Sequence, residues 1–382
     1  MKAKSISGKS SGEIKTAFEQ SLTDGFKPTL ALVFLSVKQD IKAIANLLSQ
    51  HSIQVFGATS GGEIAGSEVS EGGISILLLD MDSANFRILL ETYSGRDPME
   101  VARDMTKQAL TVFERPAFLL SNSIEKLIDL YVGEKILQAM CEVAGDNVNL
   151  WGGGAGDDLM FKETFVFNNT TITNQGILML VLDSDKVLVK GRAASGMKSI
   201  GTEKVITRSD GNWILEIDGQ PASDLIAKYM GETLTEDDYG VTNLLKDIFL
   251  KMLREDGSSI IRSVAGFLKE TKGVAVTGSI KPGDKFRFTL LPDFDVLNEV
   301  NQHARDFQEM EMPDADALVM FSCIGRIGAF GPMTSEELRG VQNAYNVPMA
   351  GLFTYGEYGR ATGGGIEFHN MTCCWVALKE KT

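Results

Sequence analysis

The stretch GATSGGE at residues 57–63 is a glycine-rich turn that follows a short apolar run and finishes with a carboxylate. The chain repeats this pattern twice. Similar turns occur as GGGAGDD at residues 152–158 and as GLFTYGE at residues 351–357. Each turn follows a buried-strand pattern, a helix with apolar residues at helical spacing, and a second short strand. The sequence therefore predicts three degenerate copies of one strand–helix–strand unit.

The β-rich residues 186–312 interrupt this repeat. The turn residues Asp210-Gly211-Asn212 separate two strand patterns there. We expect an α/β to α+β fold, with mixed β-sheets flanked by helices, repeated strand–helix–strand units and a β-rich insertion. We place a domain boundary at this turn, which gives an N-terminal segment 1–24, a first domain 25–210 and a second domain 211–382. The helix of the third unit is predicted to begin at a capping box of Thr334 and Glu337.

The charge balance argues against two kinds of partner. The chain carries 51 acidic residues against 37 Lys and Arg, a formal net charge of −14. Nucleic-acid binding needs a basic face that displaces counterions from phosphates, and an anionic membrane surface also attracts basic residues. We therefore expect no nucleic acid and no membrane among the partners.

The N-terminus and the cysteines indicate a cytoplasmic location. Residues 1–5 are polar and lead into no apolar signal-peptide core. The longest apolar runs, such as residues 176–182, are strand-sized and shorter than the ~20 residues that cross a bilayer. The four cysteines show neither a disulfide framework nor a CxxC metal spacing: Cys141, Cys323, Cys373 and Cys374.

The Gly–acid turns are the first candidates for a binding site. Successive backbone N–H groups in a glycine-rich turn can hold an anion, and a neighbouring carboxylate can accept from an ammonium. Together they suit a small zwitterion such as an amino acid. The alternative is that the glycines only permit tight packing. The candidates in the first and third turns are Thr59, Ser60, Gly61, Gly62, Glu63, Tyr355, Gly356 and Glu357.

Four further candidates lie near the third turn. Arg326 follows a buried strand and could clamp a carboxylate, although a surface ion pair would equally explain it. His369 and Asn370 stand at the edge of the last strand. Cys323 with His369 could form a thiol nucleophile and base, but a buried cysteine is usually a small hydrophobe. We therefore expect a binding protein rather than an enzyme.

Four of these stretches together resemble the FIST family, the paired N-terminal and C-terminal sensory domains of microbial signalling proteins. Residues 57–64 are similar to its N-terminal signature. Residues 321–326, 348–357 and 368–372 are similar to its C-terminal signature, in the expected order. The resemblance extends from about residue 25 to the end of the chain.

The resemblance implies a stand-alone ligand sensor that signals through a separate partner protein, such as a histidine kinase or a cyclic-dinucleotide enzyme. The implied ligand is a small molecule, an amino acid or a similar metabolite. Some family members bind haem and sense nitric oxide, so non-covalent haem b with His369 as axial ligand is the first alternative, and the only interpretation that implies a metal ligand. A Cys323-dependent enzyme is the second. A homodimer stays open.

Overall fold

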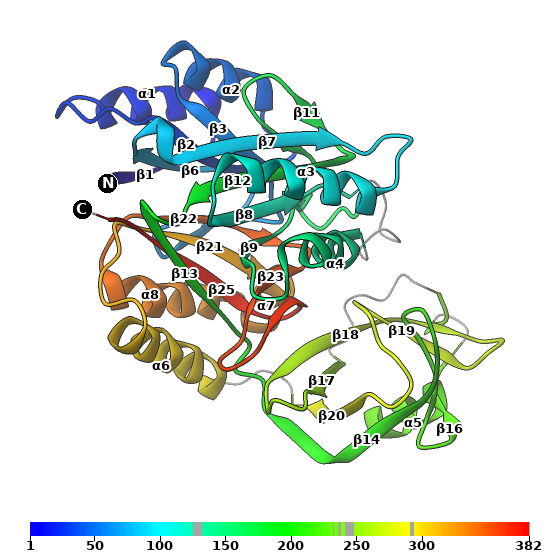
Figure 1. Ribbon diagram of the computed structural model, residues 1–382. Helices are drawn as coiled ribbons and strands as arrows, with labels where there is room; N and C mark the ends of the chain where they lie inside the picture. The colour runs from blue at the N-terminus through cyan, green and yellow to red at the C-terminus, as the bar shows by residue number, and fades with distance from the viewer. Residues whose placement is uncertain (125–131, 232, 236–237, 241–247, 291–293, 382) are drawn as a thin grey trace.

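The computed structural model describes residues 1–381 except 125–131, 232, 236–237, 241–247 and 291–293 (Figure 1). The described residues form three six-stranded mixed sheets, with helices against their outer faces, and a separate seven-stranded sheet. The predicted mixed-sheet fold with a β-rich insertion is therefore confirmed. None of the described helices is long and apolar enough to cross a membrane.

The three units share the order strand, helix, strand, helix, strand, and the first strand of each lies at the edge of a sheet. The first unit comprises β1 (Lys2–Gly8), α1 (Ser11–Ser21), β2 (Leu30–Leu35), α2 (Ile41–Gln50), β3 (Gln54–Thr59), β4 (Glu63–Ala65), β5 (Glu68–Ser70) and β6 (Ile74–Asp80). The second comprises β7 (Phe86–Thr92), α3 (Pro98–Val112), β8 (Pro116–Asn122), α4 (Val132–Ala144), β9 (Asn149–Gly154), β10 (Val166–Phe167), β11 (Ile172–Thr173) and β12 (Gly176–Asp183).

The third unit follows the same plan around a large insertion. It comprises β13 (Val187–Ala194), then, after the insertion, α6 (Phe294–Met310), β21 (Ala317–Cys323), the short α7 (Gly325–Phe330), α8 (Thr334–Tyr345), β22 (Met349–Thr354), β23 (Glu357–Arg360), β24 (Ile366–His369) and β25 (Cys373–Glu380). Helix α8 begins at Thr334 as predicted, but the capping box is wrong. The carboxylate of Glu337 bonds the Arg326 guanidinium instead of the helix end.

The sheets are equivalent because the units exchange hairpins in a ring. Their strand orders are β1-β6-β2-β3-β10-β11, β7-β12-β8-β9-β23-β24 and β13-β25-β21-β22-β4-β5. Each sheet therefore takes its last two strands from another unit: the hairpins β4–β5, β10–β11 and β23–β24, which we call the exchanged hairpins. In each unit the second and third strands, β2 and β3, β8 and β9, and β21 and β22, are parallel, which brings their carboxyl ends to one edge.

The units are joined at three backbone junctions. Gly61 N–H donates to Phe353 O and Phe353 N–H to Gly62 O, both at 2.8 Å. At the second junction, Tyr355 N–H donates to Gly154 O at 3.1 Å, and Gly154 N–H donates to Gly356 O at 2.9 Å. At the third junction, Gly156 N–H donates to Thr59 O at 2.9 Å, and Thr59 N–H donates to Phe165 O at 2.8 Å.

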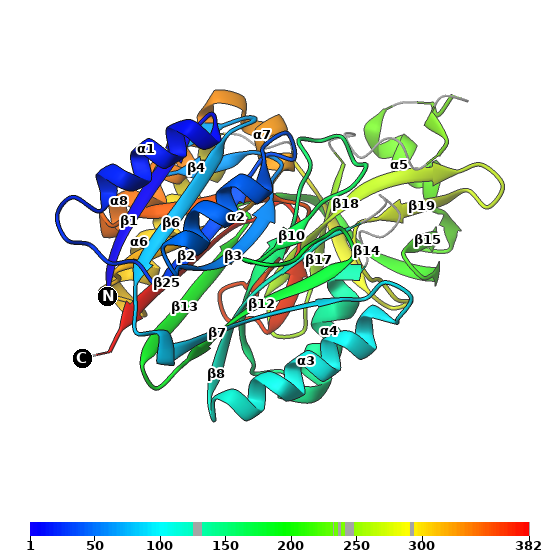
Figure 2. The same cartoon turned by 90° about the horizontal axis from the view of Figure 1, so that it is seen from above.

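An apolar cluster shared by the three sheets fills the space between them. Phe34 on β2, Leu119 on β8 and Phe321 on β21 all belong to it and are fully buried. The helix pairs α1/α2, α3/α4 and α6/α8 lie on the outer faces (Figures 1 and 2). Strands buried on both faces explain why the sequence shows continuous apolar runs rather than alternation.

The insertion forms a barrel-like domain at one end of the molecule (Figure 1). It contains β14 (Ser199–Asp210), β15 (Trp213–Ile217), β16 (Gln220–Pro221), α5 (Ala222–Met230), β17 (Phe249–Leu253), β18 (Ser259–Leu268), β19 (Gly273–Val276) and β20 (Lys285–Thr289). Pairing of β14 with both β20 and β15 curls the sheet around its own core. The sequence-based boundary at residues 210 and 211 lies at the turn of the β14–β15 hairpin.

The junctions leave no room for side chains, so a substitution there should destabilise the protein. A Cβ added to Gly156 would lie 2.3 Å from Gly61 N, a backbone atom that cannot move aside. We expect Gly156→Ala to lower the free energy of unfolding by about 2 kcal/mol or more in a urea titration. Gly365→Ala is the control, because its Cβ would meet nothing within 4 Å. Equal stability of the two variants would contradict this prediction.

Candidate ligand-binding site

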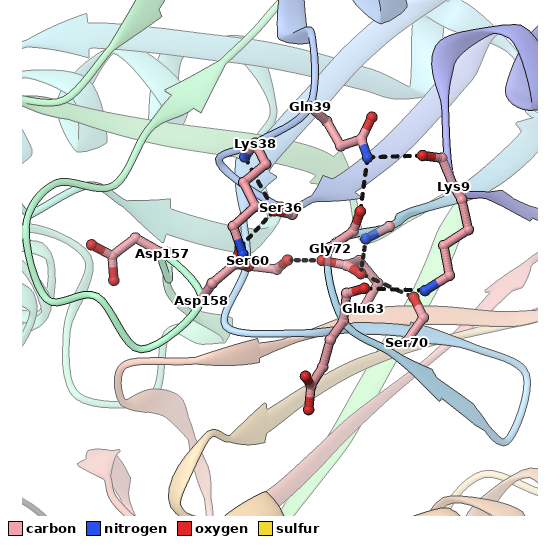
Figure 3. Close-up of polar contacts among 12 residues, drawn as sticks. Lys9, Ser36, Lys38, Gln39, Ser60, Glu63, Ser70, Gly72, Asp157 and Asp158 are labelled. Carbon is pink, nitrogen blue, oxygen red and sulfur yellow. Dashed lines mark hydrogen bonds and ion pairs between the residues drawn. The ribbon is translucent and has the colours of Figure 1, made fainter.

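The carboxyl edge of β2 and β3 brings polar groups of the first unit together with Asp158 of the second (Figure 3). Ser36 follows β2 and Ser60 follows β3, and these strands are parallel neighbours. In open α/β sheets, ligands bind outside the carboxyl ends of the strands. The edge therefore has the position at which such sheets bind ligands.

Glu63 is the buried carboxylate of this edge. Its side chain is 1% exposed. It accepts hydrogen bonds from the Ser60 hydroxyl at 2.6 Å, the Ser70 hydroxyl at 2.9 Å and the Gly73 N–H at 2.7 Å. Burial raises the pKa of Glu63, while these hydrogen bonds lower it in part. The first Gly–acid turn is thus fixed by its own carboxylate.

Lys38 and Asp158 place opposite charges at the same edge (Figure 3). The Asp158 carboxylate lies 2.9 Å from Lys38 Nζ and accepts from the Ser36 hydroxyl at 2.7 Å. The Lys38 side chain is 66% exposed, whereas that of Asp158 is 11% exposed. The bond to Asp158 raises the pKa of Lys38. This pair joins the first unit to the second and presents a cation to solvent.

The loop that carries Asp158 has unusual backbone geometry. Asp158, Leu159 and Phe161 have φ values of 54°, 61° and 51°, in the left-handed region that non-glycine residues seldom adopt. The Asp157 carboxylate holds this loop, because it accepts from the backbone N–H groups of residues 161, 162 and 163 at 2.7–3.1 Å. Such conformations persist where the surroundings enforce them, often beside functional sites.

Glu357 is the counterpart of Glu63 in the third unit. It is fully buried and accepts from the hydroxyls of Thr354 and Thr372 at 2.6 and 2.8 Å. Burial raises the pKa of Glu357 to about 7, against these hydrogen bonds. Tyr355 and Gly356, which precede it, lie at the second junction, and the Tyr355 hydroxyl donates to Asp157.

Arg326 is a buried structural cation rather than a surface residue. It is fully buried and forms a two-pronged ion pair with Glu337, with one bond of 2.8 Å. The guanidinium also donates to the Met371 and Ser195 carbonyls at 2.7 and 3.1 Å. A ligand carboxylate would have to displace these partners, so the geometry favours a role in holding α7 and α8 together.

The Nε2 atom of His369 is not available for haem ligation in this fold. An axial ligand needs a free imidazole nitrogen that faces an apolar pocket. The His369 ring is 1% exposed, and its Nε2 lies 3.1 Å from Gly359 O. Burial lowers the pKa of His369 to about 4. The residue pairs with Glu357 across β23 and β24, and its neighbour Asn370 accepts from Thr277 of the barrel at 2.9 Å.

Cys323 stands at the end of β21, beside Thr354 on the parallel strand β22. Burial raises the pKa of the Cys323 thiol far above its usual range, which opposes nucleophilic use. Among the residues that the structure describes, no group of three His, Cys, Asp or Glu side chains is placed to hold a metal ion.

The structure brings the sequence-based candidates together in two groups. Thr59–Glu63 lies at the edge of the first unit, and Cys323, Arg326, Tyr355–Glu357, His369 and Asn370 lie in or beside the third. The Gly61–Phe353 junction joins the two groups. Sequence reasoning missed Lys38 and Asp158. Polar residues directly after a buried strand, and the second acid of GGGAGDD, were the available signals.

The raised pKa of Glu357 gives a test by pH. The folded protein keeps the carboxyl proton of Glu357 up to about pH 7, whereas the ordinary pKa of a glutamate is 4.5. Between these two pH values the folded state binds more protons than the unfolded state, so the free energy of unfolding falls as pH rises. Glu357→Gln removes this contribution. As pH rises through this range, we expect the free energy of unfolding of the variant to increase relative to that of wild type by up to about 1.4 kcal/mol per pH unit.

Urea titrations at pH 5.5 and 7.5 measure this difference, with the exposed Glu68→Gln as control. A stability difference between Glu357→Gln and wild type that is the same at both pH values would contradict the prediction.

Comparison with known proteins agrees with the sequence motifs. The FIST N domain model matches residues 29–220, and the FIST C domain model matches residues 222–360. The junction between the two matches lies inside the barrel, at β16. No curated protein matches the chain. FIST domains are small-ligand sensory domains of signalling proteins. The two matches together cover more than half of the chain, which therefore belongs to the FIST family.

Proposed function

We propose that this protein senses a small zwitterionic metabolite, with amino acids as the first class, at the edge formed by Ser36, Lys38, Ser60, Glu63 and Asp158. The observation that carries the proposal is the Lys38–Asp158 pair, two opposite charges from different units at the carboxyl end of parallel strands. Unlike the buried Arg326–Glu337 pair, this pair has an exposed lysine, so a ligand can separate it, with the ligand carboxylate at Lys38 and the ligand ammonium at Asp158.

The other predicted residues have supporting roles in this proposal. Thr59, Gly61 and Gly62 fix the junction beneath the edge. Tyr355 holds Asp157, the residue next to Asp158. Gly356, Glu357 and Arg326 shape the third unit, against which the first unit packs. The side chains of Glu357 and Arg326 already have internal partners, so they would position the site rather than contact the ligand.

We also propose that output passes to a separate signalling protein, such as a histidine kinase or a cyclic-dinucleotide enzyme. The family's role in signalling supports this step. Size-exclusion chromatography with light scattering, with and without ligand, would decide whether a homodimer takes part.

Two substitutions test the ligand site. A thermal-shift screen of amino acids and related metabolites first identifies a binder, since a ligand of the native state raises the melting temperature. We expect Lys38→Ala and Asp158→Asn each to weaken calorimetric affinity about tenfold, because each removes one charged partner. The control is Lys42→Ala, an exposed lysine on α2. Unchanged affinity in both site variants would place the ligand elsewhere.

The haem alternative has a direct optical test. Because Nε2 of His369 is engaged with Gly359 and the ring is buried, we expect no Soret band shifted from free haem when the protein is titrated with haem. A band that appears in wild type and disappears in His369→Ala would reinstate the haem-binding nitric oxide sensor.

For the Cys323-dependent enzyme, Cys323→Ser should bind ligand as wild type does.

A further inference from the structure

The barrel is connected to the rest of the protein through a narrow two-stranded neck. The chain enters β14 at Ser199 and leaves β20 at Thr289, and these two residues are paired partners. Just outside them, Leu290 N–H donates to Lys198 O at 2.9 Å. Gly196, two residues earlier, has φ 67°, which other residues seldom adopt. Entry and exit therefore lie side by side, as at a hinge.

Apart from the neck, a strip of polar contacts ties the barrel to β24 and α4. Arg254 forms two bonds with the Glu367 carboxylate, at 2.8 and 2.6 Å. Arg262 donates to Phe368 O at 2.7 Å and to Glu134 at 2.9 Å. The Glu134 carboxylate also accepts from the Ser279 N–H at 2.5 Å. We call these contacts the latch.

The latch is thin. Two open grooves of about 590 and 1160 Å³ flank it, and both are lined by Glu134, Arg254 and Ser279. The Arg254 and Glu367 side chains are 27% and 24% exposed, so water and salt reach this pair. Polar interfaces between domains of one chain permit relative motion, whereas large apolar ones prevent it.

Next to the neck, a small apolar pad closes the edge of the third unit. Phe249 and Ile261 of the barrel pack with Met197, Cys323 and Met371. The Cys323 side chain is buried there, at 7% exposure. The barrel thus covers the carboxyl end of β21, the position equivalent to the candidate ligand edge at β2.

We propose that the barrel is a hinged regulatory domain: it turns about the neck at Lys198 and Leu290, and opening of the latch uncovers the carboxyl edge of the third unit at Cys323. The latch consists of hydrogen bonds and ion pairs, and water reaches its Arg254–Glu367 pair, so loss of these bonds favours the open state. A ligand or partner that favours one state would shift the balance between them. This inference does not depend on the ligand site at Lys38 and Asp158.

The rate of Cys323 alkylation reports opening of the barrel. N-ethylmaleimide modification, followed by peptide mass spectrometry, distinguishes Cys323 from Cys373 and Cys374, which are fully buried in β25. We expect the double variant Arg254→Ala, Glu367→Ala to raise the Cys323 rate about fivefold or more over wild type, with Cys373 and Cys374 unchanged. The matched control removes the exposed Lys272–Asp224 pair, which lies within the barrel.

A second variant locks the barrel closed. A Cβ on Gly364, in the turn after β23, would lie 3.1 Å from the Ser258 Cβ of the barrel, so a small outward shift of this turn reaches the ~3.5–4.5 Å Cβ spacing of a disulfide. Oxidised Ser258→Cys, Gly364→Cys protein should alkylate Cys323 more slowly than wild type and recover on reduction. Wild-type Cys323 rates in both the latch variant and the oxidised lock would overturn the proposal. So would a parallel rise at Cys373 and Cys374, which marks unfolding of the core.

Discussion

The backbone hydrogen bonds at the three junctions are the constraint on which the fold depends. No unit completes its own sheet, because the hairpin after each glycine-rich turn pairs with a strand of another unit. Each crossing requires two backbones to meet at 2.8–3.1 Å with no side chain between them, which explains the glycines at 61, 154 and 156. The ring of exchanges makes the three sheets one cooperative body around a shared core.

The same geometry decides what the acids of the Gly–acid turns do. Glu63 and Glu357 are buried where the chain crosses between sheets, and hydroxyls and backbone N–H groups take up their oxygens. Asp157 holds a long loop by three backbone bonds. These three acids thus chiefly hold the backbone of their own turns and loops. The charges left near solvent, Lys38 and Asp158, carry the proposed ligand chemistry.

The barrel breaks the threefold resemblance of the units. It is inserted between β13 and α6 of the third unit and docks on one exchanged hairpin, β23–β24. Its Phe249 and Ile261 cover the third edge, whereas Lys38 at the first edge is exposed to solvent. The similar edges of the first and third units therefore have different environments, which is how a repeated scaffold can combine a binding position with a movable cover.

Local patterns in the sequence determined the repeated strand–helix–strand order, the β-rich insertion and the family, because apolar periodicity and turn residues act over a few neighbours. The same patterns also singled out Glu63 and Glu357 as the acids of the first and third Gly–acid turns. Tertiary structure alone decided the exchange of hairpins, since strand partners come from distant segments. It paired Ser36 with Asp158, 122 residues apart, and buried Arg326 against Glu337, where the sequence allowed a surface ion pair. Burial and pairing across units are collective properties of the packed chain, so no local pattern encodes them.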